Sequence, residues 1–343
     1  MKLSDFDFHL PPELIAQTPI ENRSESRLLV VNTTTGMFKH EHFSDITKYL
    51  RPTDVLVRNN TKVIPARLFG TKLETFAHVE LLILEVKDDI CKCLVGNAKV
   101  IKLGSKVSFG DGELIAECIE VLDQGLRRFK MHYSGVFLEV LAKLGEVPLP
   151  PYIKAKLEDP DRYQTVYAKI DGSAAAPTAG LHFTESLIKQ IEELGVNVVD
   201  VTLHVGLGTF KPVDKEDILE HKMHAEAYWM SQETADILNQ AKENHHRIIC
   251  VGTTSARTVE TIMTQYGQFK ECDGMTEIFI YPGYTFKAVD ALITNFHLPK
   301  STLLMMISAF CSRQLILDAY QEAISHRYRF FSFGDSMLLT RGD

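Results

Sequence analysis

The chain has 343 residues, 45% of them hydrophobic and 24% charged, which is typical of a folded globular protein with a sizeable core. Single cores stop growing near ~250 to 300 residues, so this length favours two domains. The net charge of −8 argues against a protein that coats nucleic acid non-specifically. Acidic residues and prolines stand where a signal peptide needs an apolar run, and no later segment is apolar enough to span a membrane, so we expect a cytoplasmic protein.

The first residues predict an α/β pattern. The expected elements are a short helix at 11–17, a strand at 28–32, a helix at 43–50 and a buried strand at 54–58. The last strand is followed by Asn59-Asn60-Thr61-Lys62. Ligand sites in open α/β sheets lie at such carboxyl ends of strands, so Asn59 and Asn60 are candidate ligand contacts. A polar turn is the alternative.

The pattern changes at residues 67–148, where short apolar runs alternate with glycine-containing turns. Strands are expected at 78–86, 90–95, 106–109, 113–121 and 127–133, with a connecting helix at 136–144. The intervals leave no room for crossover helices, so pairing should be antiparallel. We predict an inserted β-barrel domain at 67–148, flanked by a discontinuous α/β domain made of 1–66 and 149–343.

Cations are clustered in the inserted domain. They are Lys99, Lys102, Lys106, Arg127, Arg128 and Lys130. Such a cluster is either a phosphate-binding surface or a solvated basic face. The six cysteines include one close pair, Cys91 and Cys93, and a lone CxC lacks the second ligand pair of a structural zinc site. We expect free thiols in a reducing compartment.

Strands and helices alternate in the remaining chain. Strands are expected at 197–204, 247–251, 277–281, 291–294 and 329–333, and helices at 185–194, 232–244, 255–266, 302–310 and 314–326. This alternation predicts a three-layer α/β/α domain with a mixed, mainly parallel sheet.

The stretch AAAPTAGLHFT, residues 174–184, combines alanines with Pro177 and Gly180, which disfavour both helix and strand. It is expected to be a loop that ends in an N-cap at Thr184. Thr178, His182 and Thr184 then lie at a helix N-terminus, where a polar or anionic ligand is held well.

Three other loops follow predicted strands. His204 ends a strand and precedes a glycine-rich loop with Gly206, Gly208 and Thr209, although a histidine there is more often a satisfied structural residue. The second loop, GTTSAR, places Thr253, Thr254 and Arg257 at a helix start, either as an anion cradle or as a simple cap. The third carries Asn295 and His297. Four polar strand ends are better explained by one shared crevice than by separate accidents.

The run HKMHAE, residues 221–226, is not the HExxH arrangement of a zinc site. We interpret His224 and Glu226 as a titratable pair on one side of a strand, where the carboxylate fixes the imidazole tautomer.

Long motifs then indicate a family. They are LIAQTPIENRSESRLLVV, DVLVRNNTKVIPARLFG, AAAPTAGLHFT, LHVGLGTFKPV, HKMHAEAY, VGTTSARTVE, DALITNFHLPKSTLLMMISAF and FSFGDSMLL. In this order they closely resemble the S-adenosylmethionine:tRNA ribosyltransferase-isomerases of queuosine biosynthesis. The resemblance covers the whole α/β part and adds Arg67, in the second motif, to the candidate substrate contacts.

The resemblance implies a transferase that joins the ribosyl unit of S-adenosylmethionine to the 7-aminomethyl-7-deazaguanine at the wobble position of tRNA. The products are epoxyqueuosine-tRNA, adenine and methionine. S-adenosylmethionine is consumed as co-substrate, so no metal and no other cofactor is expected. The partners are tRNA and S-adenosylmethionine, with neither a membrane nor an obligate protein partner, and the chain is expected to be monomeric.

This chemistry needs a general base beside the sulfonium and a general acid for adenine. Candidates are His204, His224 with Glu226, His182 and His297, and we favour His204 or His224 as base. Arg257 with the Thr253 and Thr254 amides holds either the methionine carboxylate or a tRNA phosphate. Without the resemblance, two alternatives stand: a metal-dependent hydrolase using His204, His221 and His224, and a non-enzymatic tRNA-binding module.

Overall fold

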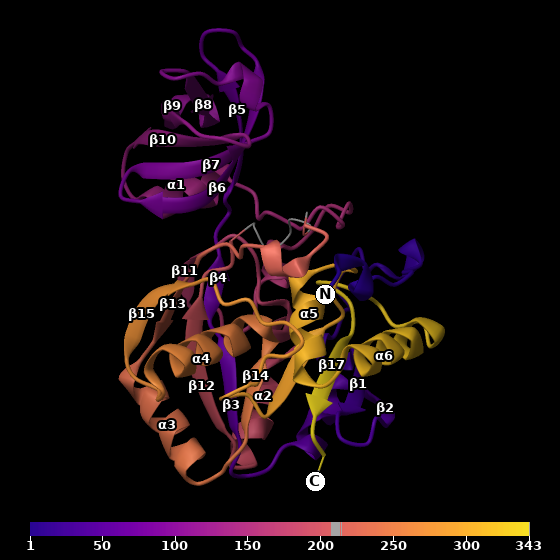
Figure 1. The fold of residues 1–343 in the computed structure, drawn as a ribbon. Helices are drawn as coiled ribbons and strands as arrows, with labels where there is room; N and C mark the ends of the chain where they lie inside the picture. The colour runs from indigo at the N-terminus through magenta and orange to yellow at the C-terminus, as the bar shows by residue number, and fades with distance from the viewer. Residues whose placement is uncertain (207–212, 214, 343) are drawn as a thin grey trace. The chain divides into compact units, whose positions relative to one another are not determined.

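The computed structural model describes residues 1–206, 213 and 215–342, and the chain forms two compact units (Figure 1). The sheet unit comprises Met1–Thr61, Pro151–Ile170 and Ala176–Asp343, and the barrel unit comprises Lys62–Pro150 and Asp171–Ala175. We had placed the insert at 67–148. The barrel unit therefore begins five residues earlier and also takes in a short segment after residue 170.

A nine-stranded mixed sheet forms the middle layer of the sheet unit, in the order β15-β13-β12-β3-β14-β16-β17-β1-β2. The strands are β1 (Arg27–Asn32), β2 (Phe38–His42), β3 (Val55–Asn59), β12 (Asn197–Leu203), β13 (Glu226–Met230), β14 (Ile248–Val251), β15 (Cys272–Thr276), β16 (Ala291–Asn295) and β17 (Ser336–Thr340). The central strands β12, β3, β14 and β16 run parallel, so their carboxyl ends meet at one edge.

Helices cover both faces of this sheet (Figure 1). The α-helices of the unit are α2 (Glu185–Glu193), α3 (Gln232–Glu243), α4 (Gly252–Tyr266), α5 (Thr302–Phe310) and α6 (Arg313–Ser325). Leu187 and Ile191 of α2 join Ile249 and Val251 of β14 in one core cluster. Side chains alternate along a strand, so Ile248 and Cys250 face the opposite side, where α3 and α4 pack. The expected three-layer α/β/α domain is confirmed.

The barrel unit contains a closed antiparallel barrel in the order β10-β7-β6-β5-β8-β9, which confirms the predicted inserted barrel. Its strands are β5 (Arg67–Lys72), β6 (His78–Lys87), β7 (Ile90–Val95), β8 (Lys106–Phe109), β9 (Leu114–Val121) and β10 (Leu126–Tyr133), followed by α1 (Phe137–Leu144). At Gly70 of β5, a Cβ would lie 2.5 Å from the Phe109 ring and 2.6 Å from the Ser108 carbonyl oxygen. Glycine is therefore required for β8 to approach β5.

Two predicted strands are wrong. Residues 277–281 lie beyond β15, because the chain leaves the sheet at Thr276, whose Oγ1 accepts a hydrogen bond from the Ile278 amide at 3.2 Å. Residues 329–333 form a tight turn, in which Phe331 has a φ of +72°. The adjoining strand is β17, a few residues later.

Several short helices are of the 3₁₀ type. They include η2 (Pro12–Leu14), η4 (Phe43–Tyr49) and η8 (Thr178–His182), where the sequence predicted helices at 11–17 and 43–50 and a loop at 174–184. A separate two-stranded sheet pairs β4 (Thr61–Val63) with β11 (Ile170–Ser173).

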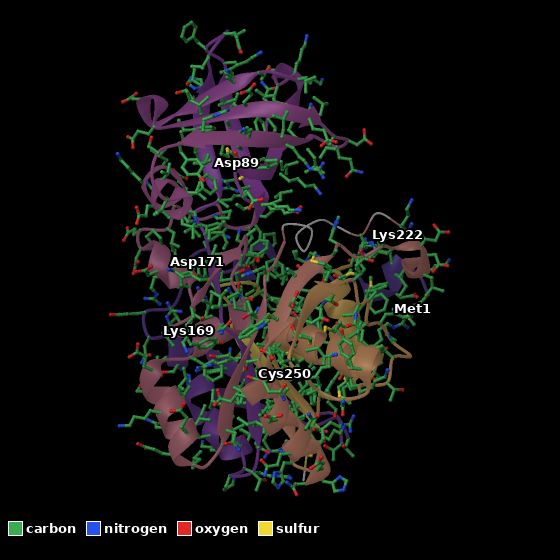
Figure 2. All side chains as sticks on the ribbon, turned by 90° about the vertical axis from the view of Figure 1, so that its left-hand side faces the viewer. Met1, Asp89, Lys169, Asp171, Lys222 and Cys250 are labelled. Carbon is green, nitrogen blue, oxygen red and sulfur yellow. The ribbon has the colours of Figure 1, made fainter. Side chains whose placement is uncertain are left out.

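Within the described ranges, no single helix is both long and apolar enough to cross a membrane, and only α5 with α6, bent by 112°, meets that criterion as a pair, on length and composition. The six cysteines are free thiols, and four of them are buried, including Cys250 in the interior of the sheet unit (Figure 2).

Candidate active site

The carboxyl edge of the parallel strands brings the predicted loops together. Asn59 ends β3, His204 follows β12, and Gly252 follows β14 and begins α4. β12 and β14 flank β3 on either side, and η8 lies against both α4 and β16. An ideal Cβ on Gly252 would lie 3.6 Å from the Ala179 Cβ of η8, so this segment contacts the start of α4.

His204 is half-buried and fixed at two points. Its amide donates to the Ala227 carbonyl of β13 at 2.9 Å, and its Nδ1 lies 2.7 Å from the Oγ1 of Thr61, which is fully buried. Thr61 is not among the predicted site residues, although it lies in the polar string after β3. Because Thr61 holds Nδ1, the imidazole has a defined orientation.

Glu226 and Arg257 form a buried ion pair beside His204. Both side chains are at most 5% exposed; Arg257 Nη1 donates to Glu226 Oε2, and Glu226 Oε1 accepts a hydrogen bond from the Gly206 amide at 3.0 Å. The carboxylate therefore ties α4, β13 and the chain after β12 together.

The predicted pairing of His224 with Glu226 is wrong. His224 is exposed and precedes β13, whereas Glu226 points into the core, toward Arg257. Lys222, two residues before His224, is likewise exposed (Figure 2). The two residues diverge because the strand begins at Glu226, so the alternation that places side chains i and i+2 on one face does not extend back to His224.

Two nitrogens of Arg257 have no hydrogen-bond partner among the described residues. These buried donors are Nε and Nη2, and the Oγ1 of Thr254, one turn earlier on α4, is likewise buried without a partner there. A buried donor without an acceptor costs about 1–3 kcal/mol. These groups, together with the N-terminus of α4 and the buried Thr253, form an arrangement suited to an anion.

His182 in η8 lies in a hydrogen-bond chain of the protein itself. Asn295 Nδ2, oriented by donation to the Phe331 carbonyl at 3.1 Å, lies 3.2 Å from His182 Nε2, while Nδ1 lies 2.7 Å from Ser26 Oγ. The Ser26 hydroxyl donates to the Arg23 carbonyl. The ring is therefore a neutral imidazole with its proton on Nδ1.

Burial lowers the pKa of His182 to about 3, with smaller contributions from the charges of Arg23 and Arg329. Both ring nitrogens have protein partners and Phe43 stacks on the ring at 5.0 Å, so His182 supports the loop. Ser26 lies within the motif LIAQTPIENRSESRLLVV, but its contact with His182 could not be found from sequence, because the two residues are 156 positions apart.

His297 is half-buried, and burial also lowers its pKa to about 3. Its Nε2 lies 2.8 Å from Thr294 Oγ1. The neighbouring Asn295 has a buried Oδ1 without a partner in the described part of the chain.

The remaining candidates have varied surroundings. The Asn59 side chain binds the Leu203 amide and carbonyl at 3.0 Å, and Asn60 Oδ1 accepts from Thr202 Oγ1 at 2.7 Å, so both asparagines join β3 to β12. Thr184 caps α2 by accepting a hydrogen bond from the Leu187 amide, as expected. Thr178 is half-buried at the start of η8.

Three further candidates and the histidines of the hydrolase alternative remain. Arg67 belongs to the barrel unit, where its Nε pairs with Glu80 at 3.2 Å. Gly208 and Thr209 lie outside the described residues. The ligand atoms of His204, His221 and His224 do not come within 4.8 Å of one another in the described part of the chain, so the hydrolase alternative has no ligand set there.

The cations of the barrel are largely engaged by the barrel itself. Arg127 is 8% exposed and its guanidinium donates to the carbonyls of Ile101, Leu122, Leu126 and Ala98. Arg128 pairs with Glu120 at 2.5 Å, and Lys130 with Asp89 at 3.7 Å. The predicted basic cluster is therefore not a continuous patch of unpaired charge.

A family model described as queuosine biosynthesis protein matches residues 3–339. The chain belongs to this family. The S-adenosylmethionine:tRNA ribosyltransferase-isomerase of Staphylococcus haemolyticus (strain JCSC1435) is 59% identical over 340 residues, covering 99% of this chain and 100% of that protein. The protein of the same name from Staphylococcus aureus (strain Newman) is 58% identical with the same coverage.

The fold is also similar to that of a solved structure. A crystal structure of an S-adenosylmethionine tRNA ribosyltransferase from Thermotoga maritima matches 98% of this chain and 99% of its own, with 38% identity and a TM-score of 0.57. Members of the queuosine biosynthesis protein family with these names are enzymes that are both transferases and isomerases. The family resemblance of the sequence motifs is confirmed, and this chain is an enzyme of that kind.

Proposed function

We propose that this enzyme transfers and isomerises the ribosyl unit of S-adenosylmethionine onto the 7-aminomethyl-7-deazaguanine at the wobble position of tRNA, giving epoxyqueuosine-tRNA, adenine and methionine. The observation that carries the proposal is the site at the end of β12, where His204, oriented by Thr61, lies beside the buried Glu226–Arg257 pair. The relatives' names supply S-adenosylmethionine and tRNA as the substrates.

His204 is the proposed general base. The positive sulfonium acidifies the adjacent ribose carbon, and when Nδ1–H donates to Thr61 Oγ1, Nε2 has the lone pair that removes this proton. The electrons left on carbon drive the departure of adenine, so the same proton can return to the purine. His224 is a weaker candidate than we expected, since it is exposed and has no orienting partner among the residues that the structure describes.

Arg257 is proposed to bind the methionine carboxylate. The side-on pair of Nε and Nη2 matches the two oxygens of a carboxylate, and Thr254 Oγ1 adds a third donor. The sequence left a tRNA phosphate as the alternative. A guanidinium that is 5% exposed is more accessible to a small molecule than to a polynucleotide backbone, which favours the carboxylate.

The other proposed properties follow from this reaction. S-adenosylmethionine is a consumed co-substrate, and the chemistry requires no metal or additional cofactor. We propose a cytoplasmic monomer that binds tRNA and S-adenosylmethionine without an obligate protein partner. The modified base must be unstacked from the anticodon loop to reach the site, because RNA is read on unstacked bases.

The decisive experiment incubates the protein with S-adenosylmethionine and tRNA that carries the aminomethyl base. Adenine should be released only when both are present, and the tRNA should gain the epoxyqueuosine mass. Adenine release without tRNA, or none at all, would contradict the proposal.

Two variants separate the proposed roles. His204→Gln should reduce kcat by about 10²–10⁴-fold, the usual contribution of a general base.

Arg257→Lys loses the bidentate fork, so it should raise KM for S-adenosylmethionine while KM for tRNA stays unchanged. A rise in KM for tRNA alone would assign Arg257 to a phosphate.

A further inference from the structure

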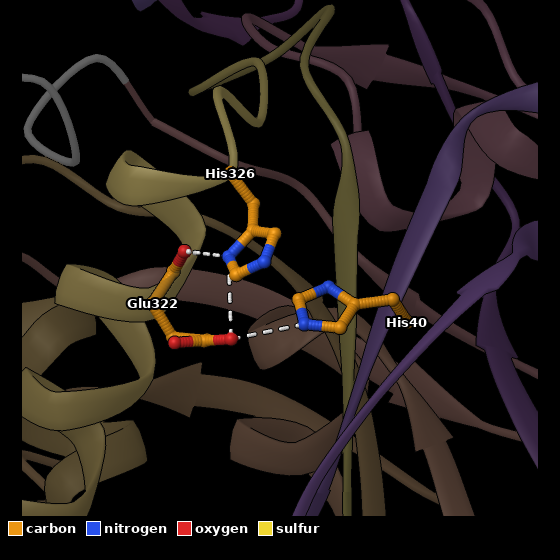
Figure 3. A group of neighbouring side chains, drawn as sticks. All are labelled: His40, Glu322 and His326. Atoms are coloured by element: carbon orange, nitrogen blue, oxygen red, sulfur yellow. Dashed lines mark hydrogen bonds and ion pairs between the residues drawn. The ribbon is translucent and has the colours of Figure 1, made fainter.

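We propose that His40, Glu322 and His326 form a binding site for a divalent transition-metal ion of the zinc type, separate from the active site. His40 lies on the edge strand β2, Glu322 on the last turn of α6, and His326 directly after that helix (Figure 3). β16, β17 and β1 lie between β14 and β2 in the sheet, which separates the two sites by about 19 Å at ~4.8 Å per strand.

The spacing of the ligand atoms fits tetrahedral coordination. Glu322 Oε1 lies 3.0 Å from His40 Nε2 and 3.2 Å from His326 Nδ1, and all three atoms are within 4.8 Å of one another. Two ligands at ~2.0–2.2 Å from a tetrahedral zinc ion are separated by roughly 3.3–3.6 Å. An ion at the centre of the three atoms therefore requires only small side-chain adjustments.

The donor set is selective for this class of ion. Two imidazoles and one carboxylate suit zinc and its neighbours, whereas magnesium and calcium prefer an all-oxygen set. The Glu322 main-chain oxygen also lies 3.0 Å from His326 Nδ1 (Figure 3). Three protein ligands leave room for water at a fourth position.

The surroundings hold His40 in an orientation suited to a ligand. Its Nδ1 lies 2.8 Å from Tyr328 Oη, an outer hydrogen bond of the kind that orients metal-bound histidines. The Arg27 guanidinium stacks on the Tyr328 ring at 3.7 Å and donates to the His326 carbonyl at 2.6 Å. When the ion binds to His40 Nε2, the ring proton between Nε2 and Glu322 moves to Nδ1. The Nδ1–H group then donates a hydrogen bond to Tyr328 Oη.

The cluster also explains an otherwise unusual contact. The His40 and His326 rings lie 4.4 Å apart, around one carboxylate. A bound ion would use both rings at once and connect the edge strand β2 to the end of α6. We infer that the ion stabilises this edge of the sheet unit and has no direct part in the reaction.

The test is a titration of the full-length protein with Co²⁺, whose visible spectrum reports its ligands. The wild type should bind one ion at a saturable site without a thiolate charge-transfer band. Glu322→Gln, which preserves size and hydrogen bonding, and His40→Gln should each weaken binding at least tenfold. Both side chains are 31% exposed, so the variants should remain folded, which circular dichroism checks.

His245→Asn is the matched control, because it removes another exposed imidazole at a position with a φ of +55° that asparagine tolerates. It should bind like the wild type. Saturating Zn²⁺ should raise the unfolding temperature of the wild type and of this control, but not of Glu322→Gln. No saturable binding, equal binding by all four proteins, or a thiolate band would overturn the proposal.

Discussion

Burial, rather than local sequence, determines what His182 does. The sequence placed it in a loop at a helix N-terminus, where a substrate contact was a reasonable hypothesis. In the structure it is 4% exposed and both ring nitrogens have protein partners. The sequence could not reveal this, because Ser26 and Asn295 come from segments more than 100 residues away.

The low pKa of His182 predicts a measurable effect on acid stability. The unfolded chain binds a proton near pH 6.5, whereas the folded protein excludes it until about pH 3. Lowering the pH from 8 to 5 therefore favours the unfolded state by about 2 kcal/mol through this residue. Between pH 8 and pH 5, the free energy of unfolding of His182→Gln should therefore fall by about 2 kcal/mol less than that of the wild type. Urea unfolding at the two pH values measures this difference. Parallel pH profiles for wild type and variant would contradict the prediction, and His245→Asn serves as the control that should follow the wild type.

The Glu226–Arg257 pair predicts strong coupling between two residues. Removing one partner leaves a buried charge and should cost about 3–5 kcal/mol of unfolding free energy. The double variant Glu226→Leu with Arg257→Met should cost much less than the sum of the two single changes. Urea unfolding of all four proteins measures this, and additive losses would show that the pair is not coupled.

At the scale of elements, η8 depends on the close packing of Gly180 against Tyr167 and Thr165. A Cβ on Gly180 would lie 2.1 Å from the Tyr167 hydroxyl and 2.8 Å from Thr165 Cγ2. That hydroxyl is buried and has no hydrogen-bond partner among the residues the structure describes. The glycine is therefore needed for space, because its neighbours are part of the core beneath the loop.

Gly180→Ala should destabilise the protein by about 1–3 kcal/mol, since the core must shift to accept a methyl group. Tyr167→Phe removes the closest contact and loses no hydrogen bond, so it should be neutral alone and restore part of the stability lost in Gly180→Ala. Thermal unfolding of the single and double variants checks both statements. If Tyr167→Phe gave no rescue, the hydroxyl would not be the source of the strain.

Elements with regular periodicity could be predicted, and elements defined by long-range pairing could not. The helices at 185–193 and 232–243 follow clear apolar spacing and N-caps, and they were found almost to the residue. The aromatic run at 329–333 has the composition of a strand, yet it turns because the Asp335 carboxylate binds the Arg329 amide at 2.7 Å and the Arg27 amide at 2.9 Å. β5 was not predicted, because Gly70 interrupts its run of strand-forming residues. The close approach of β8 to β5 nevertheless requires that glycine.

For the whole molecule, the distribution of charge matters more than its sum. The net charge of −8 requires phosphate contacts to be local, and the sequence suggested the barrel cations for this role. The structure pairs Arg128 with Glu120 and Lys130 with Asp89, whereas Lys99 and Lys102 form no ion pair with any described residue.

Replacing Arg128 and Lys130 by alanine should leave the salt dependence of tRNA binding unchanged, because carboxylates already neutralise these charges. The logarithm of affinity against the logarithm of salt concentration, from fluorescence anisotropy, gives the slope. Loss of a residue that contacts a phosphate would reduce the magnitude of this slope by about 1. The comparison variant replaces Lys99 and Lys102 by alanine. A smaller slope for the variant that lacks Arg128 and Lys130 would contradict the prediction.

The order of strands in the sheet has a consequence for biosynthesis. β1, formed by residues 27–32, pairs with β2 and, on its other side, with β17, formed by residues 336–340. β17 also joins β1 to β16 and so to the rest of the sheet. The first strand to leave the ribosome must therefore wait for nearly the whole chain to be translated before its sheet can close. Until then its apolar residues need shielding, and a nascent chain stalled before residue 336 should depend on chaperones to stay out of aggregates.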